Sequence, residues 1–421
     1  MDRASGAVPA ASLYALLILT LTYAVAFVDR QVLVLAQESI KRELHLSDAQ
    51  LGLLTGLAFS LFYVMIGIPV ARFADRGTRR TVVAISLAAW SAMTALTGFA
   101  TSYAHLFLAR MGVGIGEAGC NPPSYSMIAD LFPRERRAAA LSFYTIGANL
   151  GVLIGFLLGG WLTQTYGWRT TFFVLGPPGI LLAAILRWTV PEPKRAAIRQ
   201  TSRQSFGADL RFLAAYPTLR RLAVAIALCA LISYGSLSWT APYLIRTFKM
   251  SVIDVGTVLA LTVGIGGGIA ATAFGLIADR LTRRDARWYL WLPALAYVAL
   301  TPCFLLAYNT QGATAAIALL AIPLTLGTVF SGVSLTVVNS IAPPTMRATA
   351  SALFLLVTNL FGVGFGSWLI GLLSDHFVAS EGVQSLRTAL LIVMPVACVL
   401  AILQLLFAAR SLRADLDRAS T

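Results

Sequence analysis

Charged residues are scarce in this chain, and their scarcity limits the classes of protein that it can form. Only 12% of its 421 residues are charged, whereas 58% are hydrophobic. A soluble domain carries about 25% charged residues, so a water-soluble globule could not cover this much apolar surface. A bilayer can, because each crossing helix needs about 20 apolar residues. The composition therefore argues against a soluble enzyme and leaves no room for a large soluble domain.

Cysteine is also rare, and its spacing excludes familiar sites. The four cysteines are Cys120, Cys229, Cys303 and Cys398, each alone in an apolar segment and none in a Cys-x-x-Cys pair. This pattern favours buried thiols that pack as small hydrophobic groups over a disulfide or a zinc site. A Gly-x-x-x-x-Gly-Lys-Ser/Thr loop is missing too, which argues against an ATP site in the chain. We expect no metal and no cofactor.

Long apolar runs occupy most of the sequence and predict twelve membrane-spanning helices. They are expected near residues 12–36, 50–71, 81–101, 104–130, 138–165, 170–190, 220–245, 253–278, 288–308, 313–341, 348–376 and 387–409. The fold class predicted from these runs is an all-α membrane protein.

The basic residues indicate how the chain is oriented. Lys and Arg number 32 against 18 Asp and Glu, and they fall mostly in short segments between the apolar runs. With the predicted spans, 24 of them lie on one side of the membrane and 6 on the other. The positive-inside rule then places both termini in the cytoplasm. The net charge of +14 is thus explained by topology and by the anionic inner leaflet, not by nucleic-acid binding. The preference for Arg over Lys favours a bacterial inner membrane.

The two halves of the chain repeat each other. Residues 71–80 and 275–284 share the pattern Ala-Asp-Arg-x-Thr-Arg-Arg at an offset of 204. At an offset of 210, Pro133, Arg137, Ala138, Asn149 and Leu150 match Pro343, Arg347, Ala348, Asn359 and Leu360. Parallel repeats are typical of carriers that work by alternating access. We predict an N-terminal six-helix bundle over residues 1–190, a cytoplasmic linker over 191–220, and a C-terminal six-helix bundle with a cytoplasmic tail over 221–421.

The repeated loop also predicts a conformational latch. An Asp at a helix end can accept hydrogen bonds from Arg and from the N-terminus of a neighbouring helix, and alternating access needs a contact that breaks in one state. The predicted latch residues are Asp75, Arg76, Arg79, Arg80, Asp130, Arg137, Asp279, Arg280, Arg283 and Arg284. A simpler interpretation is that the arginines only fix the orientation in the membrane.

Four ionisable residues lie inside predicted spans, where charge is costly and usually functional. Asp29 and Arg30 are in the first span, and Arg110 and Glu117 are in the fourth. Asp29 and Arg110 reach similar depths, and Glu117 lies two turns from Arg110 near the midplane. Two acids and two bases can neutralise one another there.

The functional interpretation of this group is a joint substrate and proton site. Glu117 would take up or release a proton according to whether Arg30 or Arg110 is close, and an anionic substrate would compete for the same arginine. The alternative is a permanent ion-pair cluster that holds the two helices together.

The loop pattern resembles the signature of the major facilitator superfamily, although Ala71 and Thr78 replace its glycines. Residues 110–122 and 126–133, together with the Asp29–Arg30 pair, resemble the Spinster family within it. The resemblance implies the major facilitator fold, with twelve helices in two pseudo-symmetric bundles. Because known Spinster proteins are linked to export of lysolipids and sphingosine phosphate, it also implies an amphipathic anionic substrate such as a lysophospholipid, with its headgroup near Arg30.

Other interpretations stay open. Organic anion–proton symporters of the superfamily also carry Asp-Arg in the first span and Gly-Glu-Ala in the fourth, and a drug–proton antiporter is a third possibility. A sensor would need a sizeable soluble domain, and a channel usually lines its pore with several subunits. The expected partners are the lipid bilayer, a small amphipathic or anionic substrate and protons, with the protein acting as a monomer and without nucleic acid.

Glycine is placed where helices are expected to approach closely. The segment from Gly114 to Gly119 matches Gly-x-Gly-x-x-Gly, but it lies inside an apolar run and does not follow a strand, which argues against a dinucleotide site. A second set, at a spacing of four in the fifth span, comprises Gly147, Gly151, Gly155 and Gly159. We interpret both as close helix–helix contacts.

Overall fold

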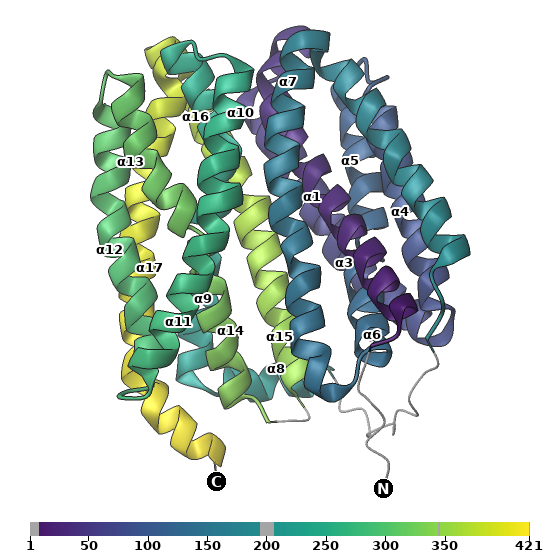
Figure 1. Cartoon of the computed structure of the whole chain (residues 1–421). Coiled ribbons are helices and arrows are strands. Elements are labelled where there is room, and N and C mark those ends of the chain that lie inside the picture. The colour runs from purple at the N-terminus through teal and green to yellow at the C-terminus, as the bar shows by residue number, and fades with distance from the viewer. Residues whose placement is uncertain (1–7, 194–205, 344–345, 421) are drawn as a thin grey trace, which may run out of the picture. The chain divides into compact units, whose positions relative to one another are not determined.

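The computed structural model describes residues 8–193, 206–343 and 346–420 (Figure 1). These described residues form helices and no strand, which confirms the all-α prediction. Nine continuous helical stretches within them are long and apolar enough to cross a membrane. Two of the nine each hold two predicted spans, separated at Gly167 and at Gly382, both of which have positive φ. With α5 (Tyr103–Glu117) and α6 (Asn121–Leu131), helices cover all twelve predicted spans.

The chain divides into two compact units. The first comprises Met1–Leu44 and Leu61–Arg199, and the second comprises His45–Ser60 and Gln200–Thr421. The first part of the predicted second span, residues 50–60, which the sequence-based division assigned to the first bundle, belongs to the second unit. The proposed linker over 191–220 and its boundaries stay a prediction.

Besides α5 and α6, the helices of the first unit are α1 (Ala10–Leu44), α3 (Ala58–Arg76, from Leu61 on), α4 (Arg79–Thr97) and α7 (Arg134–Thr189). Those of the second unit are α2 (Asp48–Gly52), η1 (Leu53–Leu57), α8 (Phe206–Ala214), α9 (Pro217–Phe248), α10 (Val252–Leu259), η2 (Ala260–Gly266), α11 (Gly267–Thr282), α12 (Trp288–Asn309), α13 (Ala313–Leu326), α14 (Phe330–Ile341), α15 (Arg347–Val357), η3 (Thr358–Gly366), α16 (Ser367–Glu381), η4 (Gly382–Gln384) and α17 (Ser385–Ser420).

The sequence repeat extends to local backbone structure. Ser47 and Ser251 each cap a helix by accepting a hydrogen bond from the N–H three residues later. Both capped helices continue into a π-helical segment, η1 and η2. Arg137 and Arg347 each direct Nε at the carbonyl oxygen five residues earlier, at 3.1 Å and 3.4 Å. The repeated residues thus form the same local hydrogen bonds in both halves.

Glycines set the distance between α1 and α7, which run beside each other (Figure 1). A methyl group added at Gly147 would lie 2.4 Å from the carbonyl oxygen of Thr20, and one at Gly151 would lie 2.3 Å from that of Ala24. Farther along, a methyl group at Gly159 would lie 2.7 Å from Cγ2 of the Val32 side chain. The interpretation of this glycine series as a close helix–helix contact is confirmed.

The same device holds α5 against α4. A methyl group at Gly116 would lie 2.8 Å from the backbone nitrogen of Trp90, and one at Gly112 would meet the side chain of Met93. Gly116 directly precedes Glu117 in the chain. The close contact with α4 therefore fixes the position of α5 next to the buried carboxylate of Glu117.

The fourth span is interrupted, although the sequence predicts one helix over 104–130. Its helix α5 ends at Glu117 and α6 begins at Asn121. Pro122 and Pro123 have no N–H to donate to the carbonyls of Ala118 and Gly119, so the α-helical ladder cannot continue. The chain bridges the gap with tighter bonds, such as that from the Cys120 N–H to the Glu117 carbonyl. The break places Glu117 at the end of a helix.

Gly151→Ala is expected to destabilise the first unit, because the new methyl group would collide with the backbone of α1. Overpacking costs about 1–3 kcal/mol, which exceeds or offsets the gain of about 1 kcal/mol in helix propensity. We expect a lower midpoint of thermal unfolding in detergent. Gly67→Ala in α3 is the matched control, since nothing lies within 4 Å of its added methyl group. Equal midpoints for the two variants would contradict the proposed packing constraint.

Candidate substrate and proton site

The four in-membrane ionisable residues lie together inside the first unit. Asp29 and Glu117 are each 2% exposed, and Arg110 is 4% exposed. The side chain of Arg30 is more open, at 22%. The predicted pairing of residues from the first and fourth spans is therefore present, with α1 supplying one acid and one base and α5 supplying the other two.

Arg30 and Glu117 form the central ion pair. The Nε of Arg30 donates to Glu117 Oε2 at 3.0 Å, and its Nη2 contacts the same oxygen. The guanidinium carbon also lies 5.1 Å from the ring centre of Phe27 and 5.9 Å from that of Tyr63. Charge-assisted hydrogen bonds and aromatic faces thus both stabilise the cation.

Asp29 is held by a different partner. The Thr94 hydroxyl on α4 donates to Asp29 Oδ2 at 2.9 Å. Arg110 is buried in the same group and interacts electrostatically with both Asp29 and Glu117. Among the described residues, Asp29 Oδ1 and Glu117 Oε1 are buried without a hydrogen-bond partner. Each carboxylate therefore presents one oxygen that can accept a proton.

A polar aromatic cluster borders the ion pair and was missed from the sequence. The Tyr144 hydroxyl donates to Asn121 Oδ1 at 2.8 Å, and Asn121 Nδ2 lies 3.4 Å from the Tyr63 hydroxyl. Tyr23 stacks on Tyr144 with ring centres 4.7 Å apart. Tyrosine is common at membrane interfaces, so these side chains gave no signal of their own. The two prolines after Asn121 were the only signal in the sequence that this part of the span is unusual.

Part of the predicted latch forms a network within the first unit. Arg79 is buried and bonds Asp130 at 2.5 Å and Glu192 at 3.2 Å. The carboxylate of Glu192 also accepts from the backbone N–H groups of Arg79 and Arg80, at 3.2 Å and 2.8 Å, at the N-terminus of α4. Glu192 was not predicted. It plays the capping role that the sequence analysis assigned to an Asp, since carboxylates favour helix N-termini.

The structure does not place the other predicted latch residues in this network. The side chains of Asp75 and Arg76 lie outside the described part of the structure, and Arg137 bonds its own loop. In the second copy, Asp279, Arg280, Arg283 and Arg284 are exposed. At an offset of 210, the counterpart of Asp130 is Ser340. The second copy therefore lacks the acid that holds Arg79 in the first.

A second buried charge cluster, inside the second unit, was also missed. Asp48 is fully buried and accepts two hydrogen bonds from Arg246, both 2.7 Å, and one from Ser374 at 2.6 Å. The backbone N–H groups of Asp48 and Ala49 donate to the carboxylate of Asp375 at 2.8 Å each. We call Asp48, Arg246, Ser374 and Asp375 the outer cluster, after the non-cytoplasmic side on which the sequence analysis expects these residues. The sequence analysis missed these residues because they lie far apart in the chain.

Known proteins match this chain over most of its length. The model of the Major Facilitator Superfamily matches residues 19–363. An MFS-type efflux pump of Mycolicibacterium smegmatis is 34% identical, covering 90% of this chain and 88% of that protein. The probable galactarate/D-glucarate transporter GudP of Bacillus subtilis is 27% identical, covering 82% and 81%.

Among solved structures, a bacterial homologue of the human lysosomal transporter Spinster is similar, in its inward-facing and unoccupied conformation. It is 30% identical, with a TM-score of 0.82, and 98% of each chain is covered. The resemblance to Spinster proteins and the expected fold are thereby confirmed. Because the superfamily model spans most of a chain that also has the fold, this multi-pass membrane protein belongs to the Major Facilitator Superfamily and is a transporter, not an enzyme.

Proposed function

We propose that the chain is a proton-coupled carrier of an amphipathic anionic substrate such as a lysophospholipid, working by alternating access. The observation that carries the proposal is the Arg30–Glu117 pair, in which a fully buried acid is held by a base that is partly open. An anionic headgroup can reach Arg30, whose side chain is 22% exposed, whereas the side chain of Glu117 is only 2% exposed. The aromatic rings of Phe27 and Tyr63 beside the guanidinium suit a ligand that is apolar next to its charge.

Substrate and proton are linked through this pair. When an anion binds Arg30, it replaces Glu117 as the partner of the guanidinium. A buried carboxylate that loses its partner is strongly disfavoured, so Glu117 takes up a proton as the substrate arrives. Binding of substrate and of proton therefore support each other, and an imposed proton gradient can drive the substrate.

Two clusters near the helix ends serve as latches in this proposal. Arg79 with Asp130 and Glu192 is at the end that the charge count places in the cytoplasm, and the outer cluster is at the opposite end. Each joins charged side chains to the N-terminus of a helix, an arrangement that water can replace once the contact opens. Alternating access requires contacts of this kind, which close one end while the other is open.

A small organic anion is the second candidate substrate, as in the symporters considered above. It is favoured by the hydroxyl and amide groups of Tyr63, Asn121 and Tyr144, which border Arg30 and could bind a polyhydroxy acid. The relative GudP is described as a probable sugar-acid transporter. Competition between lysophospholipids and galactarate for the purified protein separates the two candidates.

Glu117→Gln is expected to abolish proton-driven accumulation of substrate in proteoliposomes, because the amide cannot take up a proton. In the wild type, substrate affinity should rise as the pH falls, by at most about tenfold per pH unit for one linked proton. The variant should bind substrate with no such dependence. Glu135→Gln, an exposed acid of the same unit, is the control. Undiminished coupled flux in Glu117→Gln would end the proposal.

Arg30→Ala is expected to weaken binding of an anionic lysophospholipid by about tenfold or more, since a charged hydrogen bond contributes about 1.5–3 kcal/mol. A neutral monoacylglycerol with the same chain should lose much less. Binding is measured by scintillation proximity with purified protein, and Arg169→Ala, at a pair with Glu43 in the same unit, is the control. Equal losses for the anionic and neutral ligands would count against an anion site.

The Asp48–Arg246 pair is expected to stabilise the second unit strongly. Removing one partner of a buried pair costs about 3–5 kcal/mol, so Asp48→Asn and Arg246→Gln should each lower the midpoint of thermal unfolding. The double variant should cost much less than their sum. The same cycle on the exposed Arg413–Asp285 pair is the control and should show little coupling. Additive losses at Asp48 and Arg246 would exclude their role as a joint latch.

A further inference from the structure

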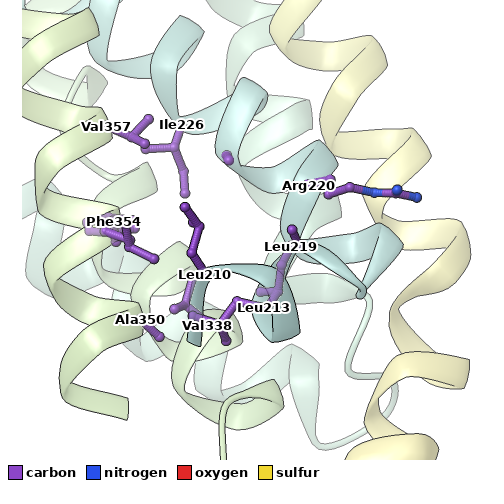
Figure 2. A pocket seen from close by; sticks show the side chains of 12 residues that line it. Leu210, Leu213, Leu219, Arg220, Ile226, Val338, Ala350, Phe354 and Val357 are labelled. Carbon is purple, nitrogen blue, oxygen red and sulfur yellow. The ribbon is translucent and has the colours of Figure 1, made fainter. Parts of the chain in front are cut away.

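The second unit contains an apolar cavity that the proposed transport mechanism does not use. It lies among α8, α9, α14 and α15 and has a volume of about 200 Å³. Its lining includes Leu210, Leu213, Ile226, Val338, Phe354 and Val357. In Figure 2 these side chains come from separate helices and border one space. Arg220 is the one charged residue among those that line it.

The size and lining of the cavity favour a hydrocarbon ligand. An engineered apolar cavity of about 150 Å³ stays dry and binds benzene. The present cavity is larger, and apart from Arg220 its lining residues are all apolar. Water would find almost no hydrogen-bond partners there, whereas a segment of an acyl chain would remain in an environment like that of the bilayer.

The position of α8 indicates which lipids can reach this cavity. The helix lies at the same end of the second unit as the C-terminus (Figure 1), which the charge count places in the cytoplasm. Leu213 is buried in the cavity wall, while Leu210 and Phe212 are 45% and 38% exposed. Apolar side chains exposed on a short helix at a membrane surface are typical of interfacial helices. The neighbouring lipids are then those of the anionic inner leaflet.

Arg220 supplies the complementary charge. Its side chain extends away from the apolar residues in Figure 2, so its stem borders the cavity and its guanidinium lies outside. Arg220 is exposed, and among the described residues no carboxylate pairs with it. By contrast, Arg221 lies over the ring of Phe407, 5.0 Å from its centre. Of these two adjacent cations, Arg220 is the one placed to meet a phosphate.

We propose that this cavity binds one acyl chain of a diacyl anionic phospholipid from the cytoplasmic leaflet, with Arg220 contacting its phosphate. The lipid is a resident ligand that joins α8 to α9 and α15, not the transported substrate. Because the proposal concerns the second unit alone, it does not depend on the Arg30–Glu117 mechanism.

Native mass spectrometry of the purified full-length protein tests this site. Phosphatidylglycerol and phosphatidylcholine with identical chains are titrated separately, and one phosphatidylglycerol adduct of higher affinity is expected. Ala223→Phe, which places a ring in the cavity, should weaken that adduct by about tenfold or more. Val224→Phe is the matched control, because Val224 is the next residue of α9 and is 48% exposed. Equal adducts in the two variants would overturn the proposal.

The headgroup contact has its own variant. Arg220→Gln should remove the preference for phosphatidylglycerol over phosphatidylcholine, while Arg410→Gln, another exposed arginine that lies over Phe407, should keep it. An unchanged preference in Arg220→Gln would refute the assignment of the phosphate to this residue.

A third measurement needs no substitution at the cavity. A phosphatidylglycerol with a photoreactive acyl chain should label peptides of α8, α9 or α15 in the wild type, and labelling confined to other helices would contradict the site. A lysophospholipid that displaces the adduct at equal concentration would assign the cavity to substrate and reject a resident lipid. The adduct should persist in Glu117→Gln, so the failure of one proposal is distinguishable from the failure of the other.

Discussion

The buried ion pair between Arg30 and Glu117 is the interaction on which the organisation of the first unit depends. Charges removed from water are tolerated only when their partners lie within hydrogen-bond reach, so α1 and α5 must be held at a fixed separation. Asp29 and Arg110 add one further acid and one further base, so the group contains two of each. A change in any one protonation state, or the arrival of one anion, therefore disturbs the balance of the entire group.

Contacts with backbone atoms supply the required positional accuracy. Gly151 faces the backbone of Ala24, and Gly155 faces the backbone of Val28 and the Cβ of Gln31, so the glycine contacts lie on either side of Asp29 and Arg30 along α1. On the other helix, Gly116 contacts the backbone of Trp90 one residue before Glu117. Such contacts adapt less than contacts between long side chains, because the backbone of a packed helix cannot rotate away. The glycines thus help to hold the helices that carry Arg30 and Glu117 in place.

The sequence predicted the spans and the grouping of the four charges because both signals are local. A charge within an apolar run stands out in isolation, and helix geometry gives its depth. The residues that were missed depend on contacts between distant parts of the chain. Asp375 caps a helix that begins more than three hundred residues earlier, at Asp48, and Glu192 lies beyond the last span of its bundle. The break before Asn121 was overlooked because apolar periodicity continues across it, although the adjoining prolines forbid a continuous helix.

The duplication explains why the two halves share local hydrogen bonds to the backbone but not the ion pairs between helices. Ser47 and Ser251, or Arg137 and Arg347, keep their local bonds because those partners lie within five residues and are inherited together. Arg79 depends on Asp130, which lies in another helix. At the position that corresponds to Asp130, the second half has Ser340. The exposed arginines of the second half therefore lack an acidic partner there. Polar contacts near the helix ends can diverge in this way because water can replace them. The charges of Asp29, Arg110 and Glu117 are buried away from water, and we propose that a proton or an anion takes the place of a side chain there. In the proposed mechanism, this difference in hydration assigns opening and closing to the ends of the helices, and proton coupling to their centre.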